Sequence, residues 1–135
     1  MTFEEVMESL GGELGLPLVP EDGAVAFEAE RGGEAMSVTI SDAGEFAELS
    51  ADLGELPLDG REEILFRMLE ANHLFEDTGG ASLSAGDGRA NLERRVPLFT
   101  LGRGDGVRIV APFLETAWKW RGVIAGRGLR VPGEI

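Results

Sequence analysis

The sequence lacks cysteine and tyrosine and has a single histidine, His73. Without cysteine the chain has no disulfide bond, no thiolate nucleophile and no cysteine metal site. One histidine cannot supply a multi-histidine metal site within one chain, and at a helix end it more often packs or interacts with the helix dipole than acts as a general base. We therefore expect no catalytic residue, no metal, no cofactor and no enzymatic activity.

Long apolar runs are also missing, since none approaches the roughly 20 residues that span a bilayer. The N-terminus carries Glu4 and Glu5 where a secretory signal would carry basic residues. We therefore expect a cytoplasmic protein that does not insert into a membrane.

Basic residues are scarce in the first half of the chain. The net charge is −13, and residues 1–60 hold 15 acidic residues and one basic residue, Arg31, whereas residues 61–135 hold 10 acidic and 11 basic residues. The negative charge of the first half of the chain repels phosphate backbones and attracts basic partners, which argues against nucleic-acid binding. Acidity that only maintains solubility explains the composition equally well.

The first half of the chain alternates between helical and strand patterns. Phe3, Val6, Met7 and Leu10 recur at helical spacing, which predicts a helix over residues 2–12. Alternation at residues 25–29 and 36–40 around a turn at 32–33 predicts a β-hairpin, and residues 46–53 predict a third strand.

A second helix is predicted after Asp59, which with Glu62 has the spacing of a capping box. Strands are predicted at 81–85 and 90–96 around a turn at 86–88, and the segment GRGDGV at 102–107 predicts a glycine-rich turn. A last helix is predicted over about 107–124, in which Pro112 either introduces a kink or lies in the first turn. Its expected inward-facing residues are Val110, Phe113, Ala117, Trp120 and Ile124.

These elements predict a single α+β domain over residues 1–125 with the order α-β-β-β-α-β-β-α, an antiparallel twisted sheet with packed helices. The glycine-rich, basic residues 126–135 predict a flexible tail.

Three segments resemble the Tir chaperone (CesT-like) family of class I type III secretion chaperones. They are ILFRMLEAN at 64–72, GGASLS at 79–84 and NLERRVPL at 91–98, and the sequence FLETAWKW at 113–120 resembles the closing helix of that family. The resemblance implies a homodimer in the bacterial cytoplasm that binds the N-terminal segment of a secreted effector in extended form and keeps it competent for export.

Two sets of candidate site residues follow. The first helix and the hairpin supply candidates for effector binding, although the same spacing is that of ordinary core residues: Val6, Met7, Leu10, Phe27, Met36 and Val38. The second helix supplies candidates for the dimer interface: Leu65, Met68, Leu69 and Asn72. Asn72 fits a register-fixing amide pair and a helix C-cap equally well. Trp118 lies two positions from Trp120, so if Trp120 is in the core, Trp118 lies at an edge or an interface.

Two other functions are compatible with the sequence. The first is an adaptor or regulatory module of the same fold that binds a folded partner and has no role in secretion. The second, less favoured, is a small enzyme whose site forms across a dimer from His73 with Glu70 or Asp77.

Overall fold

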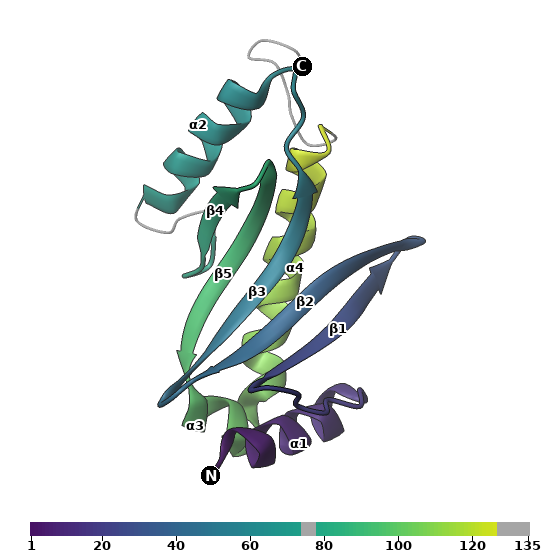
Figure 1. Cartoon of the computed structure of the whole chain (residues 1–135), viewed down its shortest axis with the longest axis vertical. Coiled ribbons are helices and arrows are strands. Elements are labelled where there is room, and N and C mark those ends of the chain that lie inside the picture. The colour runs from purple at the N-terminus through teal and green to yellow at the C-terminus, as the bar shows by residue number, and fades with distance from the viewer. Residues whose placement is uncertain (74–77, 127–135) are drawn as a thin grey trace.

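A five-stranded antiparallel sheet organises the molecule (Figure 1). The computed structural model describes residues 1–73 and 78–126. The strand order is β1-β2-β3-β5-β4, so β1 and β4 form the two edges. The strands are β1 (Ala24–Arg31), β2 (Glu34–Ala43), β3 (Phe46–Glu55), β4 (Ser82–Gly86) and β5 (Arg89–Pro97). The helices are α1 (Phe3–Leu14), α2 (Arg61–Asn72), the short α3 (Leu98–Thr100), the π-helical segment η2 (Leu101–Asp105) and α4 (Gly106–Ile124). The predicted α+β fold and its element order are confirmed.

One face of the sheet is apolar and α4 covers it (Figure 1). Strand alternation produces this face, because every second residue points to the same side. The residues of β3 that alternation places on one face are all buried, namely Ala47, Leu49, Ala51 and Leu53. The predicted inner residues of α4 are buried as well, namely Val110, Phe113, Ala117, Trp120 and Ile124. Sheet and helix together therefore form the core.

Helix α1 starts with the capping box that its first residues encode. The Glu5 N–H donates to Thr2 Oγ1, and the Thr2 N–H donates to Glu5 Oε1, both at 3.1 Å. These bonds to Thr2 lower the pKa of the Glu5 carboxyl below its usual value. The helix ends at Gly15 in the left-handed conformation (φ 70°), whose N–H bonds to the Gly11 carbonyl, and the chain then turns back along the helix.

The glycine-rich segment 102–107 lies where η2 runs into the first turn of α4. Gly104 has non-helical, left-handed backbone angles (φ 84°) and forms a kink there, so a turn is present at this glycine as predicted, with helical residues on both sides of it. The segment packs on α1, where a Cβ on Gly102 would lie 3.1 Å from Val6 Cγ2. Close approach of two helical segments thus explains this glycine. Because α4 begins at Gly106, Pro112 lies inside the helix rather than in its first turn.

The predicted capping box of α2 does not form. The helix begins at Arg61, and Gly60 at the N-cap is in the left-handed conformation (φ 77°) with no side-chain cap. The Arg61 guanidinium instead donates to the carbonyl oxygens of Leu56 (2.8 Å) and Pro57 (3.2 Å), which fixes the approach of the chain to the helix.

Asn72 is not the C-cap of α2, since His73 has that position. The Asn72 side chain instead bonds to the main chain of the edge strand β4. Its Nδ2 donates to the Leu83 carbonyl at 2.8 Å, and its Oδ1 accepts from the Leu83 N–H at 2.7 Å. The amide therefore replaces a neighbouring strand at this residue. Of the predicted tail 126–135, residues 127–135 lie outside the described residues.

Candidate binding groove and dimer face

A groove of about 470 Å³ lies between the edge strand β1 and α4. Apolar side chains line it together with Arg31 and three glutamates. The apolar lining comes from the end of α1, from β1 and from the outer side of α4: Leu14, Leu16, Phe27, Ala29, Ala111, Leu114 and Trp118. The acidic lining residues are Glu28, Glu30 and Glu115.

The groove exists because α4 lies mainly across β3 and not across β1 (Figure 1). The effect is visible in one cross-strand pair. Phe27 of β1 and Val38 of β2 are directly opposite and share the inner face, yet Val38 is fully buried and Phe27 only half-buried. The inner face of β1 is therefore the part of the apolar face that α4 leaves open.

An ion pair crosses one end of the groove. Arg31, the last residue of β1, pairs with Glu115 of α4, and its guanidinium lies 5.5 Å from the centre of the Trp118 ring. Both partners are exposed, so the pair contributes little to stability. Trp118 is half-buried at the edge of the core while Trp120 is fully buried, which matches the expected division of the two tryptophans.

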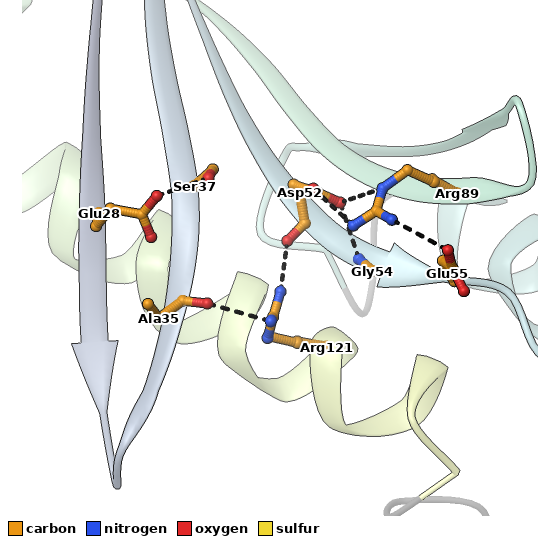
Figure 2. A network of polar contacts seen from close by, with 8 residues as sticks. All are labelled: Glu28, Ala35, Ser37, Asp52, Gly54, Glu55, Arg89 and Arg121. Atoms are coloured by element: carbon orange, nitrogen blue, oxygen red, sulfur yellow. Dashed lines mark hydrogen bonds and ion pairs between the residues drawn. The ribbon is translucent and has the colours of Figure 1, made fainter.

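A polar network fastens α4 to the sheet near this end of the groove (Figure 2). The Arg121 guanidinium donates to the carbonyl oxygens of Asp52 (2.9 Å) and Ala35 (3.1 Å), and it lies 5.9 Å from the Trp118 ring centre. It therefore holds β2, β3 and Trp118 in a fixed relation to one another.

The Asp52 carboxylate in this network accepts from Arg89 Nη2 at 2.9 Å and from the Gly54 N–H at 2.9 Å (Figure 2). Burial by itself would raise the pKa of the Asp52 carboxyl. The bonds from Arg89 and Gly54 and the charges of Arg89 and Arg121 outweigh burial, so this pKa lies below its usual value.

The six residues predicted to bind an effector do not lie together on the surface. Phe27 lines the groove. The other five are buried in the core: Val6, Met7, Leu10, Met36 and Val38. Met7 also forms part of the wall of a smaller hollow between α1 and the chain that follows it. Six further apolar residues line the groove and were not among the sequence candidates: Leu14, Leu16, Ala29, Ala111, Leu114 and Trp118. Leu16 and Leu114 carry no distinguishing signal, whereas Trp118 was identified as a residue at an edge.

A larger hollow of about 550 Å³ lies at the opposite end of the sheet. Met1, Phe46 and Phe99 are its exposed apolar residues. It lies at the turn between β2 and β3 and at the start of α3, whereas the groove runs along a strand edge. We favour the groove as the binding site because a strand edge supplies main-chain partners as well as apolar contacts.

Helix α2 has two apolar faces, and only one of them is covered. Ile64, Met68 and Ala71 are buried on the side that packs on β4. On the outer side Leu69 is 69% exposed and Phe66 is 62% exposed. Leu58, shortly before the helix, is 86% exposed. Figure 1 shows α2 standing beside the sheet edge, away from the other helices. Phe66 and Leu69 are three residues apart on the helix, so their exposed apolar side chains are neighbours and indicate an interaction surface.

The four residues predicted for a dimer interface divide between the two sides of α2. Leu69 is exposed on the outer face and Leu65 is half-buried, whereas Met68 is buried within the chain. The amide of Asn72 already bonds to Leu83. Phe66 and Leu58 were missed, although five apolar residues among positions 64–69 were a signal that the helix has more than one apolar face.

Residues suited to an enzymatic site are not assembled in the described part of the chain. His73 and Glu70 are exposed at the end of α2, and Asp77 lies outside the described residues. Within residues 1–73 and 78–126, no three histidine or acidic side chains come together as a metal site. No helix in the same residues is long and apolar enough to cross a membrane.

The fold and these two apolar surfaces define a protein that binds other polypeptides. The model of the Tir chaperone protein (CesT) family matches residues 5–121, and the chain belongs to this family. The family is one of chaperones and not of enzymes. The resemblance found in the sequence is therefore confirmed, and the class is that of type III secretion chaperones.

Solved structures with the same fold include the HopA1-SchA chaperone-effector complex, with a TM-score of 0.66 and 21% identity over 88% of this chain and 92% of that chain. The ExsC-ExsE complex gives a TM-score of 0.68 and 16% identity, over 90% of this chain and 92% of that chain. The ExoU-SpcU heterodimeric complex from the type III secretion system of Pseudomonas aeruginosa gives a TM-score of 0.63 and 16% identity, over 90% of this chain and 95% of that chain. A comparison with curated protein sequences returned no match.

Proposed function

We propose that this chain is a bacterial cytoplasmic chaperone that binds the N-terminal segment of a secreted effector in extended form and keeps it competent for export. The observation that carries the proposal is the groove along β1, where an edge strand lies beside apolar side chains that α4 leaves open. The chaperone acts by binding alone, without a catalytic residue, metal or cofactor.

The bound segment adds a strand to the sheet at β1. Main-chain hydrogen bonds to β1 supply affinity that does not depend on sequence, and every second side chain of the segment enters the groove. Phe27, Leu114 and Trp118 are the side chains that these inserted residues contact. Of the six sequence candidates, Phe27 is thus in direct contact, while the five buried ones support the groove from within.

Two copies of the chain pair through the outer face of α2. Leu69 and Phe66 expose apolar surface there that a second copy would cover, and Leu65 is half-buried on the same helix. Leu58, just before the helix, is a further exposed apolar residue. A two-fold pair would bring the same face of both copies together. In the dimer, one groove lies on each copy, so an extended segment has two binding positions available.

Co-expression with N-terminal segments of candidate effectors tests the binding proposal. The intact chain should form a stable complex in which the segment is protected from protease in solution. Trp118→Ala combined with Phe27→Ser should abolish protection, whereas Val19→Ser, which alters an exposed apolar residue outside the groove, should not. Capture of a folded partner domain without protection of an extended segment would support the adaptor function instead.

Light scattering tests the dimer independently. The intact chain should have twice the mass of one copy, and Leu69→Glu with Phe66→Glu should give a folded monomer. Glu63→Ala is the matched control, since Glu63 is an exposed polar residue of the same helix. A monomeric intact chain would contradict the dimer and leave the groove intact as a proposal.

A further inference from the structure

The pairing of β1 with β2 determines which main-chain groups of β1 face outward. The Asp42 N–H donates to the Gly23 carbonyl at 2.8 Å, and the register continues from Ala24 opposite Ser41 to Arg31 opposite Glu34. Hydrogen-bonded and non-bonded pairs alternate along an antiparallel ladder. Odd-numbered residues of β1 therefore bond to β2. The N–H and C=O groups of Ala26, Glu28 and Glu30 point away from it, toward any strand that arrives at this edge.

The side chains of β1 also alternate between the two faces of the sheet, with odd-numbered residues on one face and even-numbered residues on the other. Val25, Phe27 and Ala29 share the inner face, where their opposite residues in β2 are buried. Glu28 and Glu30 consequently lie on the open face, both exposed. Glu28 is held in position because Ser37 Oγ donates to its Oε1 at 3.0 Å (Figure 2). The edge thus presents an apolar row on one face and two carboxylates on the other.

We infer that the groove selects extended segments in which apolar residues alternate with lysine or arginine. In adjacent strands of either orientation, neighbouring side chains lie on the same face of the sheet. Segment residues beside Phe27 and Ala29 therefore enter the apolar groove. The residues between them lie beside Glu28 and Glu30, where a basic side chain forms a cross-strand pair.

This inference rests on the proposed function and specifies the chemistry of its ligand. Charge complementarity identifies the occupant, because the strands of the acidic N-terminal half surround this edge and attract basic segments. The two carboxylates also disfavour pairing with β1 of a second copy, since identical acidic residues would then face one another. The same residues therefore exclude self-association and favour a basic strand.

Three fluorescently labelled ten-residue peptides test the selection by anisotropy titration against the full chain. The first alternates valine with lysine at its centre, the second replaces each lysine with glutamine, and the third has the composition of the first with its lysines moved to one end. The intact chain should bind the first peptide about three- to tenfold more tightly than the second or the third.

Glu28→Gln with Glu30→Gln should remove this preference, so that the lysine and glutamine peptides bind the variant with similar affinity. The control is Glu45→Gln with Asp59→Asn, which removes two exposed charges from the same acidic half but away from the groove. It should retain the preference. Thermal melting of both double variants checks that they fold.

The possible outcomes separate the inference from the proposed function. A preference that persists without Glu28 and Glu30, or that falls equally in the control, overturns the inference. Equal binding of the lysine and glutamine peptides to the intact chain overturns the inference and leaves the groove as a binding site. Absence of binding for all three peptides overturns both.

Discussion

Two adjacent glycines of α1 should respond in opposite ways to the same substitution. Gly11 and Gly12 both lie within the helix, where alanine is intrinsically favoured over glycine by up to about 1 kcal/mol. Their surroundings differ. A Cβ on Gly12 would meet nothing within 4 Å, whereas a Cβ on Gly11 would lie 2.7 Å from the Leu16 carbonyl oxygen. That contact is with main chain, so a side-chain rotation cannot relieve it.

The expected magnitudes follow from these two terms. Gly12→Ala should raise the free energy of unfolding by about 0.5–1 kcal/mol. Gly11→Ala gains the same helix preference but introduces overpacking of about 1–3 kcal/mol, so its net loss of stability lies between about 0 and 2.5 kcal/mol. Because the obstacle is a main-chain oxygen at 2.7 Å, we expect the upper part of this range, about 1–2.5 kcal/mol. For a chain of 135 residues, about 1 kcal/mol corresponds to about 3–4 °C in Tm. We expect Tm to rise by about 2–4 °C for Gly12→Ala and to fall by about 4–9 °C for Gly11→Ala.

Differential scanning calorimetry of both variants at a single protein concentration keeps the effect of any self-association constant. Binding adds a second readout, because Leu16 lines the groove and Gly11→Ala must displace it. Gly11→Ala should therefore weaken capture of an extended segment, while Gly12→Ala should not. Equal stabilisation by both substitutions would show that the chain does not turn back against α1 as described.

Substitutions at three other positions test the contacts that surround the two surfaces. Asn72→Ala should cost about 1–3 kcal/mol in chemical unfolding, because it leaves the N–H and C=O of Leu83 without the bonds of 2.7 and 2.8 Å; Asn72→Asp should restore little, since a carboxylate cannot donate to the carbonyl. Arg121→Met should cost about 1–3 kcal/mol and change the fluorescence of Trp118, because the carbonyl oxygens of Asp52 and Ala35 lose their donor. Asp52→Asn should cost at most about 1 kcal/mol at neutral pH, since the Arg89 pair is partly exposed. The lowered pKa of Asp52 gives the sign of its pH dependence: the stabilisation is complete above the usual value of about 3.8 and is lost as the pH falls through the lower value in the folded state. Urea unfolding from pH 6 to pH 2 should therefore show wild type and Asp52→Asn converging at the acidic end, and a constant difference would contradict the role of the carboxylate.

The spacing of apolar residues predicted the helices and strands well, because burial of one face of each element determines that spacing. The inner residues of β3 and α4 are those that alternation and helical spacing identify, since each element has one face toward a single core. The capping box at Asp59 was predicted wrongly for a local reason. Its spacing is correct, but Gly60 adopts a left-handed conformation that places the start of α2 at Arg61. A capping pattern in sequence does not specify the backbone conformation of the residue between.

Groove residues could not be separated from core residues by pattern alone. Met36, Val38 and Phe27 have the same strand alternation, and all belong to one apolar face. Which of them stays open depends on where α4 crosses the sheet, and that is decided by packing between segments far apart in the chain. Phe27 is half-buried on the edge strand β1, whereas Met36 and Val38 are fully buried on β2, one strand further in.

The edge strand β4 is covered within the chain and the edge strand β1 is not. This difference favours β1 as the edge that binds a partner. Exposed edges are a risk because their free main-chain groups pair with other strands, and proteins usually cover them. At β4 the Asn72 amide occupies both main-chain groups of Leu83, and α2 packs alongside. At β1 the outward groups of Glu28 and Glu30 have no main-chain hydrogen-bond partner among the described residues. A fold that closes one edge with a side-chain amide and leaves the other beside an apolar groove retains an edge for binding. The carboxylates of Glu28 and Glu30 then restrict which strands can use it.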